Sequence, residues 1–320
     1  MLEKRTLGKT DIKVSPIGIG VMLWLDGKGL IWGRFPAVSK ETENSIIKEA
    51  VDGGINFFDT AEIYGFGKSE RALSSALQAN KIADADIVIG TKWRPIFRRA
   101  KNMRKTIYKR IECLSPYSID LYMVHFPYGT FSRVKGQMKE MSSLLRDNKI
   151  GSIGVSNFNE KSMRKAYGLL ENEGIPLAVN QVEYSLLKRS IESNGVLDTA
   201  EELGITIVAY SPIHQGLLTG KYHSKPELLK NKSRLFGMGF KKRLLKTQPL
   251  IDILTEVGKK YNATTSQVAL NWLITNRGKT VIAIPGATKI GHAQESAGAM
   301  TFQITNSERE EINIASQKVI

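Results

Sequence analysis

The feature of this 320-residue chain that most constrains its fold is a regular alternation between two kinds of segment. Short runs of apolar, β-rich residues recur, and stretches with the apolar spacing of helices lie between them. In residues 39–54, for example, Ser39 is placed to cap a helix, acids follow in the first turn and glycine ends the segment. The apolar runs cover residues 17–20, 56–58, 87–90, 119–124, 150–155, 177–182, 205–209 and 280–284.

This alternation predicts a closed parallel sheet. Strands separated by helices pair in parallel, because each return needs a crossover, and runs that are apolar throughout indicate a sheet covered on both faces. Eight such strands over this length predict an α/β fold with one domain, a (β/α)8 TIM barrel formed by residues 1–320. Outside the repeat, residues 3–15 predict an N-terminal β-hairpin, and residues 212–247 predict a long loop after strand 7.

The net charge of +15 is concentrated in two segments. Residues 91–110 hold nine lysines or arginines and no acid, and residues 213–247 hold nine against Glu227 alone. Basic segments can bind nucleic acid or another anionic ligand. Neither segment carries a zinc-finger, RNA-recognition or helix-turn-helix signature, so solvated faces are the favoured interpretation and nucleic-acid binding is the lesser alternative.

The sequence also bears on the compartment. No run approaches the ~18 apolar residues that a membrane helix needs, and the charged start "MLEKRTLGKT" lacks the apolar core of a signal peptide. Cys113 is the only cysteine, so neither an intrachain disulfide nor a cysteine metal cluster can form. We therefore expect a cytoplasmic protein that needs no metal and has no membrane partner.

Polar residues stand at the ends of most of the predicted strands. They are Asp59, Lys92, His125, Ser156, Asn157, Gln181, Tyr210 and Ser211. Taken alone, Asp59 could be a cap, Lys92 a surface lysine, and His125 a core histidine. In a barrel, however, all strand ends meet at the C-terminal rim, where active sites lie, and this convergence favours a shared site.

These groups allow a specific chemistry. A lysine beside an aspartate stays charged, and its cation favours the phenolate of a nearby tyrosine, which lowers the tyrosine pKa. Tyr64, five residues after Asp59, could then act as a general acid towards a carbonyl oxygen, while His125 donates a hydrogen bond to that oxygen. The hydride must come from a cofactor, because no side chain supplies one.

With these residues in view, the chain resembles the aldo-keto reductase family from about Arg5 to the C-terminal helix. The stretches that carry the resemblance are "DTAEIYGFGKSERALSSAL", "IDLYMVHFP", "IGSIGVSNF", "NQVEYSLL", "AYSPIHQGLLTGKY" and "IPGATK". The resemblance implies a catalytic tetrad of Asp59, Tyr64, Lys92 and His125. It also implies a nicotinamide cofactor extended across the barrel mouth, which agrees with the lack of a G-x-G-x-x-G motif after a strand.

The resemblance further assigns the cofactor contacts. Ser156, Asn157 and Gln181 would hold the carboxamide, and Tyr210 would stack on the nicotinamide ring. The rest of the cofactor would contact Gly20, Val21, Met22, Asp59, Ser211, Pro212, Leu217, Gly220, Lys221, Gly286, Thr288, Lys289, His292, Glu295 and Ser296. The chain departs from the family at Val21–Met22, often Thr-Trp, and at His292 and Ser296, often Gln and Asn.

We therefore expect an oxidoreductase that reduces aldehydes or ketones with NADP(H), as a preference over NAD(H) that is not exclusive. Lys289 and His292 favour the extra phosphate of NADPH. Aromatic side chains predict a pocket for aryl aldehydes, aliphatic aldehydes or small diketones, with no evident arginine fork for a carboxylate: Trp24, Trp32, Trp93, Phe126 and Tyr128. A cofactor-sensing subunit of the potassium-channel β type is the alternative. Residues 221–246 predict a mobile flap over the cofactor, and the oligomeric state stays open.

Overall fold

The computed structural model describes residues 2–25, 30–31, 35–36, 38–231 and 234–320. Its central feature is an eight-stranded parallel sheet in the order β12-β11-β10-β9-β8-β7-β6-β3. Parallel bridges from Ile17 to Ala283 and from Gly20 to Gly286 join the two edges and close the barrel. The strands are β3 (Ile19–Gly20), β6 (Phe57–Asp59), β7 (Val88–Trp93), β8 (Leu121–Val124), β9 (Ser152–Ser156), β10 (Leu177–Glu183), β11 (Thr206–Tyr210) and β12 (Val281–Ile284).

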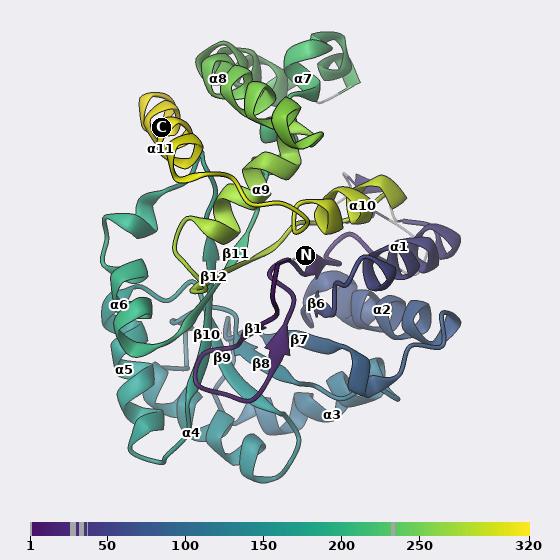
Figure 1. The fold of residues 1–320 in the computed structure, drawn as a ribbon. Coiled ribbons are helices and arrows are strands. Elements are labelled where there is room, and N and C mark those ends of the chain that lie inside the picture. Colours follow the sequence, from purple (N-terminus) through teal and green to yellow (C-terminus); the bar gives the residue numbers. More distant parts are fainter. Residues whose placement is uncertain (1, 26–29, 32–34, 37, 232–233) are drawn as a thin grey trace.

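Helices surround the strands (Figure 1). They are α1 (Lys40–Asp52), α2 (Lys68–Ala79), α3 (Asn102–Leu114), α4 (Val134–Arg146), α5 (Glu160–Glu171), α6 (Val196–Leu203), α7 (Lys221–Ser224), α8 (Arg234–Tyr261), α9 (Thr265–Thr275), α10 (Ile290–Gly298) and α11 (Asn306–Val319). Short 3-10 helices are η1 (Tyr64–Gly67), η2 (Asp84–Asp86), η3 (Ser190–Glu192), η4 (His214–Thr219) and η5 (Pro226–Asn231). The predicted (β/α)8 barrel is confirmed.

Local chemistry sets the start of α1 as expected. The Ser39 side chain accepts a hydrogen bond from the backbone N–H of Thr42, Glu41 and Glu43 lie in the first turn, and Gly53 is the C-cap. A Ser cap satisfies a free N–H, and acids there interact favourably with the helix dipole. The helix then buries Ile46, Ile47 and Ala50 against the barrel, which is where most of its stability comes from.

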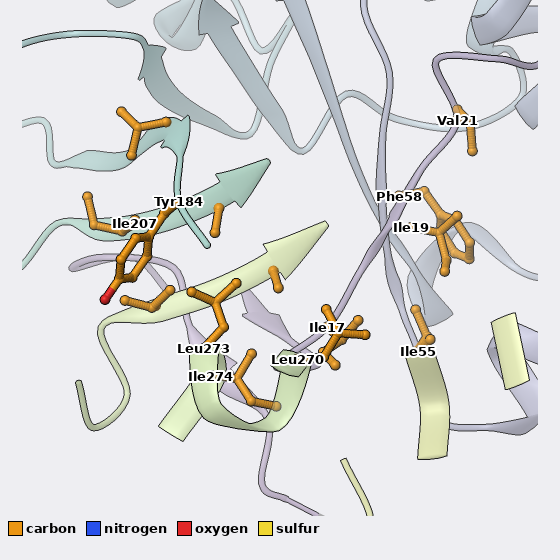
Figure 2. Close-up of a cluster of buried hydrophobic side chains, with 14 of the residues drawn as sticks. Ile17, Ile19, Val21, Ile55, Phe58, Tyr184, Ile207, Leu270, Leu273 and Ile274 are labelled. Carbon is orange, nitrogen blue, oxygen red and sulfur yellow. The ribbon is translucent and has the colours of Figure 1, made fainter. Parts of the chain in front are cut away.

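The apolar core lies in two layers. The larger layer fills the space between the strands and the helices, and Figure 2 shows Leu270, Leu273 and Ile274 of α9 among strand side chains such as Ile17 and Ile207. The second layer lies inside the barrel. Helices on one face and a filled interior on the other explain why the strand sequences are apolar throughout.

The N-terminal hairpin closes one end of the barrel. Its strands β1 (Arg5–Thr6) and β2 (Lys13–Val14) pair antiparallel, as predicted, and Leu7 and Val14 are buried with the interior layer. The guanidinium of buried Arg5 donates hydrogen bonds to the carbonyls of Ile274 and Val281. Gly8 has φ +54°, and a Cβ there would lie 2.5 Å from the carbonyl oxygen of Ala178, so glycine lets the turn press against the barrel.

The predicted long connection after strand 7 is present at residues 212–247, and helices occupy most of it. After β11 the chain forms η4, α7 and η5, and α8 begins at Arg234 and runs through Pro249 to Tyr261. Glycines and this proline weaken the helical pattern of the sequence. Packing of α8 on α9 and α11 overrides that local preference. A second small sheet pairs β4 (Leu30–Ile31) with β5 (Phe35–Pro36).

None of the helices in the described residues combines the length and hydrophobicity that a bilayer crossing needs.

The contribution of the hairpin to the free energy of unfolding can be measured. Leu7→Ala should lower the free energy of unfolding by about 2–5 kcal/mol, because it removes methyl groups from a fully buried site and leaves a cavity. Thr6→Ala, at the exposed neighbouring position of β1, should change it by no more than about 0.5 kcal/mol. Urea unfolding followed by circular dichroism checks both. Equal effects of the two substitutions would contradict the role of Leu7 in the barrel interior.

Candidate active site

The barrel brings the predicted polar residues together at the C-terminal ends of its strands. Asp59 is the last residue of β6, Lys92 lies one residue before the end of β7, and His125 follows β8 directly. Gln181 of β10 pairs in register with Ser156, the last residue of β9. Residues from five strands therefore share one rim, although up to 122 positions separate them along the chain.

A buried ion pair forms the centre of this rim. The Lys92 Nζ lies 2.6 Å from Asp59 Oδ2 and donates a second hydrogen bond, 2.7 Å long, to the carbonyl of Thr60. Burial alone would lower the pKa of Lys92, but the charge of Asp59 raises it above its ordinary value, so the ammonium stays charged. Gln181 Nε2 donates to the other carboxylate oxygen at 2.8 Å.

Tyr64 lies beside this pair. It starts η1, and the Lys92 Nζ is 5.3 Å from the centroid of its ring. Gly65, Phe66 and Gly67 follow with positive φ, a tight turn that leads into α2. The predicted net lowering of the Tyr64 pKa is wrong. Burial raises the pKa above its ordinary value, and Lys92 opposes that rise with the expected sign.

His125 completes the group as a neutral imidazole. Its ring meets the Tyr64 ring edge-on, with centroids 6.1 Å apart, and stacks on Phe126 at 4.8 Å. Burial, with the charges of Lys92 and Arg94, lowers the His125 pKa to about 3. Its Nδ1 is buried and has no hydrogen-bond partner among the residues that the structure describes. A neutral ring beside a tyrosine hydroxyl can polarise a carbonyl oxygen without competing for the proton.

The side chains expected at the carboxamide form a connected network. Asn157 Nδ2 donates to the His125 carbonyl at 3.2 Å and to Ser156 Oγ at 3.0 Å. The Tyr210 hydroxyl donates to Asn157 Oδ1 at 3.0 Å. Asn157 and Ser211 both have positive φ and follow directly after the ends of β9 and β11. This network holds polar groups beside the tetrad.

A second cluster of basic residues lies at the end expected for adenosine. Burial lowers the His292 pKa, Glu295 opposes this, and the charges of Lys289 and Lys221 lower it further, so these residues are neighbours. The backbone N–H of Thr288 donates to His292 Nδ1 at 3.2 Å, and Ser266 donates to Glu295 Oε2 at 3.0 Å. Ser296 is buried and donates to the His292 carbonyl of its own helix.

The other expected cofactor residues border the same rim. The Val21 N–H donates to the Asp59 carbonyl at 3.0 Å, which ties the end of β3 to the tetrad. Gly286 is exposed beside Gly20. Pro212 and Leu217 are buried, whereas Met22 and Gly220 are partly exposed.

The expected substrate pocket is only partly matched. Trp24 and Trp93 have no exposed surface and donate hydrogen bonds to Ala287 O and Asn102 Oδ1, so both are core residues and do not line an open pocket. Phe126 is partly exposed, Tyr128 is 72% exposed, and Trp32 lies outside the described residues.

The structure adds charged residues that the sequence reasoning missed. Glu62 Oε1 accepts hydrogen bonds from the backbone N–H of Arg94 at 2.7 Å and from Arg98 Nη1 at 2.5 Å. Buried Glu70 accepts from Thr91 Oγ1 at 2.7 Å and pairs with Arg110 at 3.0 Å, and its burial raises the Glu70 pKa to about 7. Glu62 and Glu70 lie outside the strands, so the pattern of strand ends does not mark them. For Arg94 a usable signal existed, because it follows Lys92 by two positions, the spacing of one strand face.

Comparisons with known proteins give a consistent result. The sequence profile of the Aldo/keto reductase family matches residues 16–317. A pyridoxal reductase from the chloroplast of Arabidopsis thaliana is 29% identical over 321 residues, 96% of this chain and 84% of the relative. An uncharacterised oxidoreductase of Mycobacterium bovis is 32% identical over 310 residues, 95% of this chain and 90% of the relative.

Solved structures give the same picture of the fold. A glycerol dehydrogenase from Gluconobacter oxydans matches with a TM-score of 0.80 at 25% identity, over 99% of this chain and 96% of that one. An aldo-keto reductase from Klebsiella pneumoniae, solved with NADPH, matches with a TM-score of 0.73 at 22% identity, over 98% and 95%.

The buried ion pair yields a stability prediction. Asp59→Asn leaves the ammonium of Lys92 buried without its carboxylate and should lower the free energy of unfolding by about 3–5 kcal/mol. Adding Lys92→Met should restore a large part of that loss. In Asp59→Asn the Lys92 pKa falls below its unfolded value of ~10.4, so the unfolded state binds more protons and stability rises with pH towards that value. Urea unfolding at pH 7 and pH 9.5 tests this, and a double variant as unstable as Asp59→Asn alone would refute it.

Proposed function

This chain belongs to the aldo/keto reductase family, and on that basis we propose that it reduces aldehydes or ketones to alcohols, with Tyr64 as the general acid and NADPH as the hydride donor. The observation that carries the proposal is the position of the Tyr64 ring, 5.3 Å from the Lys92 ammonium and edge-on to neutral His125. A hydroxyl, a cation and a hydrogen-bond donor then meet around one point, as carbonyl reduction requires.

The residues present fit a nicotinamide dinucleotide. Asn157 and Gln181 place side-chain amides beside the tetrad, and the cluster of Lys221, Lys289 and His292 offers basic groups for phosphates. Gly286 leaves the rim open, because a Cβ there would meet nothing nearer than the Gly20 carbonyl at 3.8 Å. Relatives in the family use this cofactor class, and two solved members from Klebsiella pneumoniae hold NADPH or NADP.

Each residue of the tetrad has a separate task. When bound, the nicotinamide supplies a hydride to the carbonyl carbon. Tyr64 gives its hydroxyl proton to the carbonyl oxygen, so the product is a neutral alcohol and the tyrosine is left as phenolate. The Lys92 cation stabilises that phenolate, and Asp59 keeps Lys92 charged and in place. His125 donates a hydrogen bond to the carbonyl oxygen as negative charge develops there.

Aromatic side chains at the rim support the proposed substrate class. Exposed Tyr128 and partly exposed Phe126 offer aromatic contacts near His125, with their centroids 6.4 Å apart. We propose aryl aldehydes, aliphatic aldehydes or small diketones as substrates. The pyridoxal reductase relative agrees with this choice, because pyridoxal is an aromatic aldehyde.

The role of Tyr64 is tested by Tyr64→Phe. This change removes one oxygen and should lower kcat for a nitrobenzaldehyde by about 10² or more, because it deletes the general acid. NADPH affinity, measured by quenching of protein fluorescence, should stay within about threefold, and the unfolding midpoint should not fall. The assignment fails if kcat of the variant stays near that of the unchanged enzyme.

The preference for NADPH rests on Lys289. Lys289→Glu should lower kcat/KM for NADPH about tenfold more than for NADH, because it removes a cation from the 2′-phosphate and adds a repulsive charge. Lys105→Glu, an equal charge change at an exposed position of α3, is the matched control and should leave the ratio unchanged. Steady-state rates at fixed ionic strength measure it. The preference would be overturned if the kcat/KM of the unsubstituted enzyme with NADH equals or exceeds its kcat/KM with NADPH.

A further inference from the structure

Arg94 is the first residue after β7 and lies beside the reacting groups. The backbone N–H of His125 donates to the carbonyl of Trp93 at 2.9 Å, which sets Arg94 and His125 at neighbouring strand ends. Arg94 is fixed there by its own N–H, which donates to Glu62 Oε1 at 2.7 Å. The position of this residue is therefore set by the same strands that position the tetrad.

The charge of Arg94 is not neutralised by the protein. Arg94 is a partly buried residue, and in the part of the chain that the structure describes its guanidinium takes part in no hydrogen bond and no ion pair. Its neighbours are paired. Lys92 lies 2.6 Å from Asp59, and Arg98 lies 2.5 Å from Glu62. The carboxylates of Asp59 and Glu62 are thus occupied by other cations, which leaves Arg94 available for a ligand.

This charge acts on the site where the carbonyl would bind. Burial lowers the pKa of His125 most, and the charges of Lys92 and Arg94 lower it further, in keeping with the place of Arg94 at the strand end next to His125. The cations assigned to the cofactor, Lys221 and Lys289, act on His292 instead. Arg94 is therefore a basic residue beside His125, separate from the lysines that are assigned to the cofactor phosphates.

The surrounding loops are packed in a way that holds this centre in place. A Cβ at Gly129 would lie 2.4 Å from the carbonyl oxygen of Pro95, so the loop after β8 touches the loop that begins at Arg94. The exposed aromatic rings of Phe97 and Tyr128 come from these two loops. A guanidinium can bind a planar anion while aromatic side chains of the same loops contact its ring.

We propose that Arg94 binds an anionic group of the substrate, so that this enzyme prefers carbonyl compounds that carry a carboxylate or a phosphate. This inference rests on the proposed reductase function and names the substrate class of the same site. A guanidinium binds either group through two parallel hydrogen bonds. Binding also gives a partner to a cation that has none among the described residues, which a neutral substrate does not do.

Matched substrates test the proposal. We expect kcat/KM with NADPH to be about tenfold or more higher for 4-carboxybenzaldehyde, or for 4-formylphenyl phosphate, than for methyl 4-formylbenzoate. Arg94→Gln should remove this advantage mainly through KM while changing the ester rate less than about threefold, and Arg94→Lys should restore part of it. Arg99→Gln, at an exposed position of the same loop, is the control and should leave the preference intact. The carboxylate and phosphate arms show which anion the site takes.

The outcomes separate this inference from the proposed function. The role of Arg94 would be overturned if the ester is reduced with a kcat/KM as high as that of both anionic substrates. It would also be overturned if Arg94→Gln lowers kcat/KM equally for all substrates. Either result would leave the reductase function intact. Absence of turnover for every aldehyde would overturn the reductase function. In that case calorimetric titration with benzoate and with benzamide decides on Arg94, because binding of benzoate that Arg94→Gln does not weaken would reject it.

Discussion

The ammonium of Lys92 is fully buried, and a charge in that position is stable only if a carboxylate and further hydrogen-bond acceptors lie beside it. Asp59 and the Thr60 carbonyl provide them at 2.6 and 2.7 Å. This requires β6 and β7 to pair in one register, with Asp59 opposite Gly90, two residues before Lys92. Gln181 then reaches the second carboxylate oxygen from β10, so barrel closure and the ion pair depend on each other.

The ion pair also explains why the site can hold two neutral groups beside it. Burial raises the pKa of Tyr64 and lowers that of His125 to about 3, so at neutral pH the phenol keeps its proton and the imidazole carries no charge. Lys92 contributes to the His125 shift and limits the Tyr64 shift. Burial thus keeps Tyr64 protonated, the buried cation helps to keep His125 neutral, and the same cation stabilises the phenolate that remains after proton transfer.

The sequence predicts the strands, the hairpin and the Ser39 cap because these depend on local pattern, and the rim residues follow because barrel topology converts strand ends into neighbours. Other features depend on burial that no local pattern reveals. The helical structure around α7 and α8 comes from packing. Trp24 and Trp93 are buried, although their position near strand ends suggested a pocket. The Tyr64 pKa rises because desolvation outweighs the neighbouring cation, a balance that needs three-dimensional burial.

The basic segment 91–110 shows that a charge pattern in the sequence does not reveal which cations are paired in the fold. It contains no acid, yet four of its cations pair with acids from other segments: Lys92 with Asp59, Arg98 with Glu62, Arg104 with Glu140, and Arg110 with Glu70. Lys109 pairs with Glu112 in the next turn of α3. Of the other basic residues in this segment, Arg99, Lys101 and Lys105 are exposed to water, whereas Arg94 is half-buried beside His125. More than half of the segment's cations therefore pair with acids, and the partly buried cation that has no such partner among the described residues lies where a substrate would meet the tetrad.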